Sequence, residues 1–242
     1  AYGQRRRYLL GDQLDSVMNY PFAAAILHFV RYGGGQAFLD AILSITEHYP
    51  PQVTAVLMNH IGTHDTERAI SRLAGEDCKG YGRQWQHEHD RLGEYEYLKG
   101  VSMMKIASLI QYTLPGVPSL YYGDEAGMEG LRDPFNRECM NWDKPNEELH
   151  RWYKRLGEIR MGCKVFAHGE FVPVYSNHKT IAYLRSDEDS EVLVAVNLDD
   201  TDVDIFVGEQ WDNSYNFFDA KAENGYIHLE PTRYTMLTRV KQ

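Results

Sequence analysis

The sequence is poor in cysteine, with Cys78, Cys139 and Cys163 as its only three in 242 residues. Three scattered thiols are too few for a disulfide framework or a cysteine-based zinc cluster, so we expect reduced cysteines. No apolar run approaches the roughly 20 residues that a membrane-spanning helix needs. The first eight residues are basic, but no apolar stretch follows them, so they do not resemble a secretory signal peptide.

Positive charge is also scarce, because 25 lysines and arginines face 35 aspartates and glutamates, which gives a formal net charge of −10. Nucleic acids and anionic membranes both favour basic surfaces, so we expect neither as a partner. The content of hydrophobic residues, 43%, is typical of a globular chain with a sizeable core. A neutral polyhydroxylated ligand is compatible with this charge balance, although the charge does not point to one.

Residues 55–68 read Ala-Val-Leu-Met-Asn-His-Ile-Gly-Thr-His-Asp-Thr-Glu-Arg. The apolar run 55–58 predicts a buried strand, and residues 66–73 predict a helix. A strand that ends in His and Asp before a helix is typical of a parallel α/β barrel, which carries its chemistry at this end of its strands. The alternative is that Asp65 caps the helix, and a capping role is compatible with a chemical role.

Metal binding is not predicted. His60 and His64 have the spacing of a zinc-binding helix, but Gly62 lies between them and no glutamate follows His60, so the metalloprotease pattern fails. His87 and His89 have no third or fourth ligand near them in the sequence.

Strand-like and helix-like segments alternate three times in residues 1–162, which predicts a parallel sheet covered by helices. The expected strands are 13–19, 55–58 and 117–122, and the expected helices are 22–32, 36–49, 66–73, 92–112 and 146–161. Residues 163–242 instead carry short β-type runs separated by turn residues, at the spacing of an antiparallel β-sandwich. These runs are 171–175, 180–185, 192–197, 203–207, 215–218, 225–229 and 235–238.

The aromatic residues of this second part are expected to fill the sandwich core rather than to form a sugar-stacking platform. They are Tyr183, Phe206, Trp211, Tyr215, Phe217 and Phe218.

Further motifs point to a family. Residues 15–21 read Asp-Ser-Val-Met-Asn-Tyr-Pro, residues 116–130 read Gly-Val-Pro-Ser-Leu-Tyr-Tyr-Gly-Asp-Glu-Ala-Gly-Met-Glu-Gly, and Asp-Pro-Phe-Asn-Arg and Trp-Asp follow at 133–137 and 142–143. Together with 55–68 they resemble the α-amylase family of glycoside hydrolases, especially its neopullulanase, cyclomaltodextrinase and maltogenic amylase branch. The resemblance implies α/β plus all-β architecture: strands 6–8 of a (β/α)8 TIM barrel in residues 1–162, then a β-sandwich domain in 163–242.

The resemblance also implies roles for individual residues. Asp65 corresponds to the family's third carboxylate, which stabilises the developing oxocarbenium charge, and His64 donates hydrogen bonds to the sugar beside it. Asp133 and Arg137 match a motif that contacts glucose units on the non-reducing side. The alternative for this pair is a structural ion pair. Asn19 and Tyr20 are expected at the barrel lip, in contact with sugar.

The family's nucleophile motif, Gly-x-Arg-x-Asp, and its acid region do not occur in these residues and are expected before Ala1. Because such carboxylates act as a unit, we expect the chain alone to be inactive and its parent enzyme to cleave α-glucosidic bonds in maltodextrin, cyclodextrin or pullulan. Unpaired strand edges predict self-association or pairing with the missing half of the barrel.

Other functions stay open at this point. The parent could be an α-glucan transglycosylase, a non-catalytic amylase-like scaffold, or a protein that binds glycans through its β domain. No cofactor is expected, and calcium in the parent is left open. The branch and the unpaired cysteines favour the cytoplasm.

Overall fold

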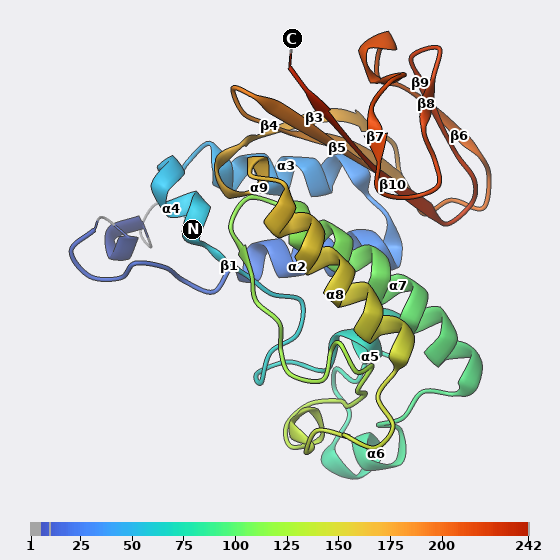
Figure 1. Cartoon of the computed structure of the whole chain (residues 1–242). Coiled ribbons are helices and arrows are strands. Elements are labelled where there is room, and N and C mark those ends of the chain that lie inside the picture. Colours follow the sequence, from blue (N-terminus) through green and yellow to red (C-terminus); the bar gives the residue numbers. More distant parts are fainter. Residues whose placement is uncertain (1–5, 10, 242) are drawn as a thin grey trace.

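Three parallel segments lie side by side in the computed structural model, which describes residues 6–9 and 11–241 (Figure 1). β1 (Met58–Asn59) pairs in parallel with β2 (Val117–Pro118), and Met18 forms a parallel bridge with Met58 on the other side. The backbone N–H of Met58 donates to the carbonyl of Val17 at 3.1 Å, and the N–H of Val117 donates to the carbonyl of Leu57 at 2.8 Å. The three segments therefore stand in chain order.

These strands are much shorter than the sequence predicts. The run 55–58 was expected as a strand, but its first two residues end α4 (Pro51–Val56). Two prolines explain the difference, because Pro50 precedes the helix and Pro51 occupies its first turn, where a missing N–H costs nothing. The predicted strand 13–19 contributes only the bridge at Met18, and the predicted strand 117–122 pairs only over its first two residues.

Helices cover the parallel segments and supply most of the larger core. Phe22, Ile26 and Phe29 of α2 are almost fully buried, as their helical spacing predicts. Leu98 of α7 (Glu94–Thr113) is 61% exposed, although Val101 and Met104 of the same helix are buried. None of the described helices is both long and apolar enough to cross a membrane. The bounds are η1 (Arg6–Leu9), α2 (Tyr20–Tyr32), α3 (Gly35–Thr46), α5 (Ala69–Ala74), α6 (Arg83–Glu88), α7 (Glu94–Thr113), η2 (Phe135–Arg137), α8 (Glu147–Gly162) and α9 (Val165–His168).

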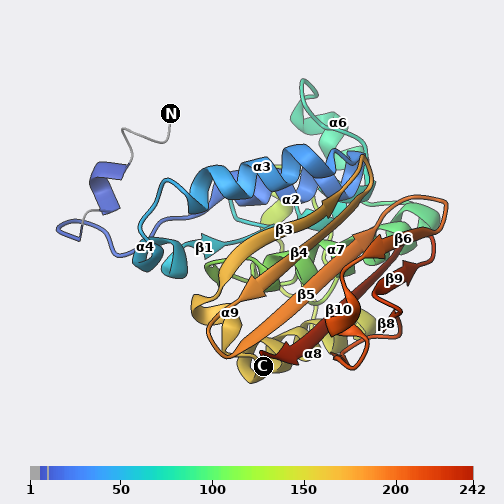
Figure 2. The same cartoon turned by 90° about the horizontal axis from the view of Figure 1, so that it is seen from above.

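Two antiparallel sheets follow, with strand orders β3-β4-β5-β10-β7 and β6-β9-β8. One face of the five-stranded sheet packs on helices and the other packs on the three-stranded sheet (Figures 1 and 2). The continuous apolar run of β5 follows from this, because both faces of that strand are buried. The strands are β3 (Glu170–Ser176), β4 (Thr180–Ser186), β5 (Ser190–Asn197), β6 (Val203–Phe206), β7 (Tyr215–Asn216), β8 (Ala222–Glu223), β9 (Tyr226–Leu229) and β10 (Arg233–Val240), with η3 (Glu209–Trp211) between β6 and β7.

The aromatic residues of the β region divide into two groups. Tyr183 and Trp211 are buried, as expected, and Phe217 and Phe218 are partly buried against the larger core. The expectation of burial was wrong for Phe206 and Tyr215, which are 62% and 61% exposed. Phe206 lies on the face of β6 that points away from the five-stranded sheet, whereas Tyr215 lies on the edge strand β7 with its ring 5.1 Å from that of Phe217.

A buried arginine joins the β region to the helices. Arg185 of β4 donates hydrogen bonds to the backbone carbonyls of Thr113, at the end of α7, and of Phe166 and Gly169, in and after α9. These acceptors are neutral carbonyl dipoles, and burial lowers the pKa of Arg185 to about 9. The side chain thereby supplies donors to carbonyls at the ends of α7 and α9, where helix carbonyls have no partner within the helix.

Replacing Asn146 by alanine is expected to lower the free energy of unfolding by about 1 kcal/mol. Its side-chain oxygen accepts from the N–H of Leu149 at 3.0 Å and so caps α8, and its amide donates to the hydroxyl of Tyr97 at 3.1 Å. Urea denaturation measures the change. Asn213→Ala, at an exposed turn, is the matched control, and equal stabilities of the two variants would contradict the capping role.

Candidate active site

Asp65 lies in the loop between β1 and α5, beyond the carboxyl end of the central parallel segment. Its side chain is 55% exposed. One carboxylate oxygen is 3.2 Å from Nε2 of His64, and the other accepts from the hydroxyl of Tyr20 at 3.2 Å. The N–H of Asp65 donates to the hydroxyl of Thr63 at 3.1 Å, which fixes the backbone. The carboxylate is thus held by neighbours yet remains open to solvent.

The alternative role of Asp65 as a helix cap is not what the structure shows. α5 begins at Ala69, with Arg68 in the cap position and no side-chain cap hydrogen bond. Residues 64 and 65 form a turn, and residues 66–68, where the helix was expected to begin, are not helical. The Asp65 carboxylate is therefore not consumed by helix N–H groups.

The loop after β2 supports the same site. The buried side chain of Asn136 donates to the carbonyls of His64 and Thr66 at 2.9 and 2.7 Å. Nε of Arg137 donates to the carbonyl of His64 at 3.1 Å, and it lies 3.5 Å from the Asp133 carboxylate. The predicted residues His64, Asp133 and Arg137 are thus brought together with Asp65. Asp133 and Arg137 form the ion pair that the sequence left as an alternative, and both are still about half exposed.

Asn19 does not fit its predicted contact with sugar. Its side chain is almost fully buried, its oxygen accepts from the N–H of Phe22 at 3.4 Å, and its amide donates to the Asn59 side chain at 2.9 Å. These bonds begin α2 and link two parallel segments. The next residue, Tyr20, is 41% exposed and reaches Asp65. The proximity of Tyr20 to Asp65 follows from the parallel pairing, since the carboxyl ends of adjacent strands meet at one edge of the sheet.

Beneath the loop lies a buried ion pair that sequence reasoning missed. Arg68 and Asp124 are both buried, with Nη1 4.0 Å from a carboxylate oxygen. The Arg68 guanidinium lies 4.4 and 4.5 Å from the ring centres of Tyr121 and Tyr122, and it donates to the Tyr122 carbonyl. Burial raises the pKa of Asp124 to about 7, although Arg68 opposes this. A Cβ on Gly62 would stand 2.5 Å from the Asp124 carboxylate, so this position requires glycine.

His60 lies under Tyr20 rather than in the open site. Its ring meets the Tyr20 ring edge-to-face, with centres 4.6 Å apart, and it is 2% exposed. Burial lowers the pKa of His60 to about 4, so the imidazole is neutral at neutral pH. Its role in this arrangement is to support the Tyr20 ring.

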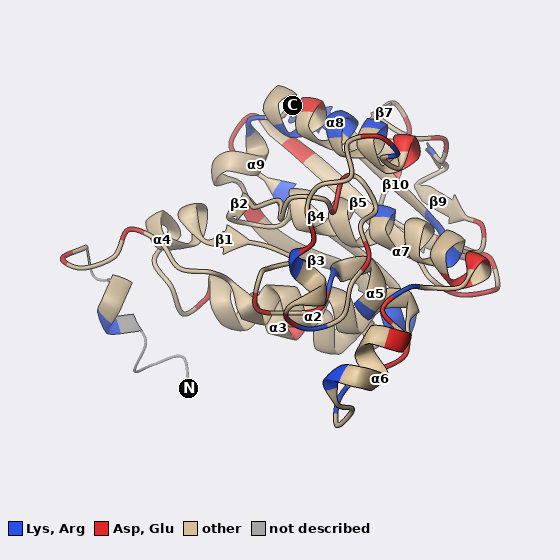
Figure 3. Ribbon diagram, turned by 90° about the horizontal axis from the view of Figure 1, so that it is seen from below, with Lys and Arg blue, Asp and Glu red and all other residues tan. Residues whose placement is uncertain are grey.

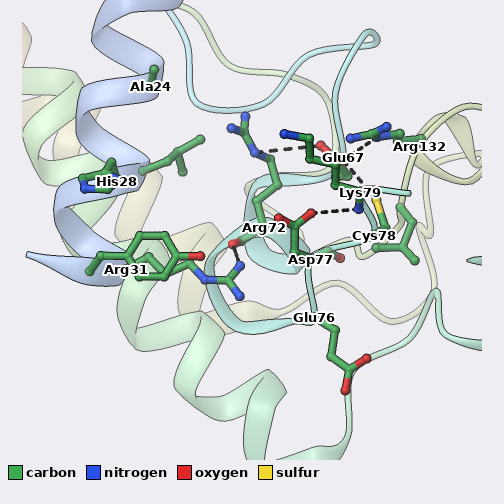
Figure 4. A pocket seen from close by; sticks show the side chains of 14 residues that line it. Ala24, His28, Arg31, Glu67, Arg72, Glu76, Asp77, Cys78, Lys79 and Arg132 are labelled. Carbon is green, nitrogen blue, oxygen red and sulfur yellow. Dashed lines mark hydrogen bonds and ion pairs between the residues drawn. The ribbon is translucent and has the colours of Figure 1, made fainter. Parts of the chain in front are cut away.

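The segment that follows Asp65 is anchored at a cavity of about 350 Å³ (Figure 4). A Glu67 oxygen accepts from Nε of Arg132 at 2.8 Å and from Sγ of Cys78 at 3.1 Å. Burial, together with the Glu67 carboxylate, raises the pKa of the Cys78 thiol to about 11. Cys78 is therefore a hydrogen-bond donor rather than a nucleophile.

The charge around the site is mixed. Acidic and basic positions are interspersed over the loops after β1 and β2 (Figure 3). Within residues 6–9 and 11–241, no three His, Cys, Asp or Glu side chains gather as a metal site requires.

This arrangement can bind and stabilise a polyhydroxylated ligand that gains positive charge. An imidazole, a carboxylate and a phenol are in contact with one another and exposed to solvent, and all three groups are able to form hydrogen bonds to hydroxyl groups. A fixed carboxylate stabilises positive charge that develops nearby, and this effect is larger when water is excluded. Glycoside hydrolysis passes through such an oxocarbenium-like transition state.

Several known proteins are similar to this chain. The family model described as "Alpha amylase, catalytic domain" matches residues 2–165. A cyclomaltodextrinase from a Bacillus species is 33% identical over 198 residues, which cover 79% of this chain and 31% of the relative. A cyclomaltodextrinase from Thermoanaerobacter pseudethanolicus is 32% identical over 230 residues, covering 93% and 36%. The solved structure of a cyclomaltodextrinase gives a TM-score of 0.78 at 26% identity, covering 98% of this chain and 39% of that one.

The chain thus spans about a third of the length of the curated relatives that it matches. The family model covers the parallel segments, the loop with His64 and Asp65, and the loop with Asp133 and Arg137. The match to the family model shows that this chain belongs to the α-amylase family.

Proposed function

We propose that this chain supplies the third carboxylate and part of the sugar site of an enzyme that hydrolyses α-glucosidic bonds with retention of configuration. The observation that carries the proposal is Asp65, held between His64 and Tyr20 yet open to solvent, with Arg137 bonded to the same loop. The relatives named cyclomaltodextrinase support cyclic or linear α-glucans as the substrate.

In this proposal the three parallel segments are strands 6–8 of a (β/α)8 barrel. Their outer edges, at Met18 and at β2, have no strand partner among the residues that the structure describes. Val56 and Val117, at the ends of these segments, are 42% and 49% exposed. Open edges with apolar neighbours favour pairing with further strands, either from a second copy or from a polypeptide that carries the other half of the barrel.

The nucleophile and the general acid would come from that other half. The 242 residues contain no Gly-x-Arg-x-Asp motif, and Asp65 alone provides neither a covalent intermediate nor proton transfer to the leaving oxygen. The isolated chain is therefore expected to hydrolyse nothing, although it carries groups that act in the transition state.

A chimera tests the proposal. In the Bacillus cyclomaltodextrinase, the matched segment is replaced by this chain, so that the relative supplies the remaining strands and carboxylates. The chimera is expected to release reducing sugar from cyclomaltodextrin, and the isolated chain is expected to release none. The relative with the segment deleted is the matched control.

Two outcomes would contradict the proposal. One is turnover by the isolated chain on maltodextrin, cyclodextrin or pullulan at enzyme-like rates, because it would place the key carboxylates within these residues. The other is a chimera with a cooperative melt and full mass that turns over none of the three substrates. Formation of longer oligosaccharides by the chimera would instead identify glycosyl transfer.

A further inference from the structure

The outward face of the three-stranded sheet carries two exposed aromatic rings. Phe206 of β6 and Tyr226 of β9 are directly opposite each other in the register and are 62% and 50% exposed. Their ring centres are 5.1 Å apart and their planes meet at 58°. The alternate residues, Ile205 and Ile227, point into the core, so the sheet needs neither aromatic ring for its packing. Two exposed rings in contact with each other make this face a candidate binding surface.

Polar groups stand beside these rings on the same face. Asp204 and His228 form the next cross-strand pair, with Nδ1 of His228 2.9 Å from the Asp204 carboxylate. Nε2 of His228 points towards Asp202 at 4.0 Å. Residues two apart on a strand lie about 7 Å from each other, so the ring pair and the polar pair fall within one or two sugar units. Glu223 of β8 lies opposite Tyr226 and extends the row.

We propose that this platform, made of Phe206, Tyr226, Asp204, His228 and Glu223, is a second α-glucan site, separate from the Asp65 site. Aromatic rings stack on the apolar C–H face of a pyranose, while carboxylates and an imidazole form hydrogen bonds to its hydroxyl groups. The platform offers both kinds of contact side by side.

Several features favour a neutral, α-linked glucan over other ligands. Three carboxylates lie on or beside the platform, on Asp204, Glu223 and the neighbouring Asp202, against one lysine, Lys221, whose Nζ is 4.0 Å from the Glu223 carboxylate. This acidic excess disfavours anionic ligands such as nucleic acid or lipid head groups. The planes of the two rings meet at 58°, which suits successive units of a curved α-1,4-glucan better than those of a flat β-1,4-glucan. The choice of α-glucan rests on the proposed function, whereas the presence of a platform does not.

Such a site would hold one part of a glucan polymer on the β region while another part of the same glucan occupies the Asp65 site. The gain in affinity then depends on ligand length, because only a long chain reaches both sites at once. The affinity of the Asp65 site for a short oligosaccharide is therefore not raised by the platform.

The test uses the 242-residue chain in native gels containing soluble starch, with Kd for maltoheptaose measured by calorimetry. The double variant Phe206→Ala/Tyr226→Ala is expected to bind about fivefold or more weakly and to lose its retardation by starch. Tyr226→Phe keeps the ring and should retain binding. Tyr215→Ala, equally exposed on β7 of the other sheet, is the matched control and should bind as the parent chain does. Arg137→Ala separately weakens the Asp65 site.

The outcomes separate the two sites. Starch binding that is lost in Arg137→Ala but unchanged in the double variant would overturn the platform and leave the proposed function standing. Binding lost in the double variant and kept in Arg137→Ala supports the platform, whether or not the chimera is active. Equal binding of cellohexaose, or no starch binding at all, would overturn the proposal. So would a double variant that only loses self-association in sedimentation velocity, because the rings would then contact a second copy.

Discussion

Replacing Asp65 by asparagine is expected to lower kcat of the chimera about 100- to 1,000-fold, with little change in KM. Asparagine preserves the shape of the side chain and can still accept the hydrogen bond from the Tyr20 hydroxyl. What it removes is the negative charge that opposes the positive charge of the transition state. An interaction that is stronger in the transition state than in the ground state changes kcat rather than KM.

Steady-state kinetics on cyclomaltodextrin measure both constants. Asp200→Asn, at an exposed aspartate of the β region, is the matched control and should leave kcat unchanged. A rise in KM at constant kcat would show that Asp65 only binds the resting sugar. An unchanged kcat/KM would remove Asp65 from the catalytic machinery altogether.

Much of this site could be predicted because neighbouring parallel strands bring distant motifs to one edge. His64 and Asp65 follow the second segment, and Asp133 and Arg137 follow the third, so their proximity required only the correct strand order. The error at Asn19 has a physical reason. The side chain of a residue at the end of a strand can point outward to a ligand or inward to the next helix. The Asn19 side chain points inward and accepts a capping hydrogen bond from the N–H of Phe22, and this choice is seen only in the structure.

The elements show the same limit. The apolar period of α2 and the continuous apolar run of β5 were sufficient to predict a helix and a buried strand. The apolar run 55–58 misled, because the preceding prolines begin a helix that extends to Val56. Phe206 was misjudged because alternation assigns residues to a face but does not say which face the other sheet covers.

Arg68 and Asp124 were missed because both belong to motifs dense in polar residues, and burial cannot be read from residue type. Signals were nevertheless present. Gly62 and Gly123 stand close to the two charges, and side chains there would collide with Asp124 and with Met128 and Arg68. A glycine in a loop between a strand and a helix therefore indicates a position where another side chain comes too close for a Cβ atom.

Replacing Arg68 by methionine is expected to lower the free energy of unfolding by about 3–5 kcal/mol near pH 8. The variant leaves the Asp124 carboxylate buried without its cation, and it removes the cation–π contacts with Tyr121 and Tyr122. Methionine fills most of the aliphatic volume, so a cavity contributes little. Urea denaturation measures the loss, with Arg155→Met as the matched control. Arg155 is half exposed, and its ion pair with Glu158 contributes about 1 kcal/mol or less.

The pH dependence distinguishes an unpaired charge from simple loss of packing. Burial raises the folded-state pKa of Asp124 to about 7, from an ordinary value of 3.8. The folded state therefore binds more protons than the unfolded state between about pH 4 and 7, and this group lowers stability as pH rises through that range. Without Arg68 the pKa rises further, so the cost of Arg68→Met should be smaller at pH 5, where Asp124 is protonated, than at pH 8. Adding Asp124→Asn should remove that difference. A cost that is equal at both pH values would show that the arginine acts only through packing.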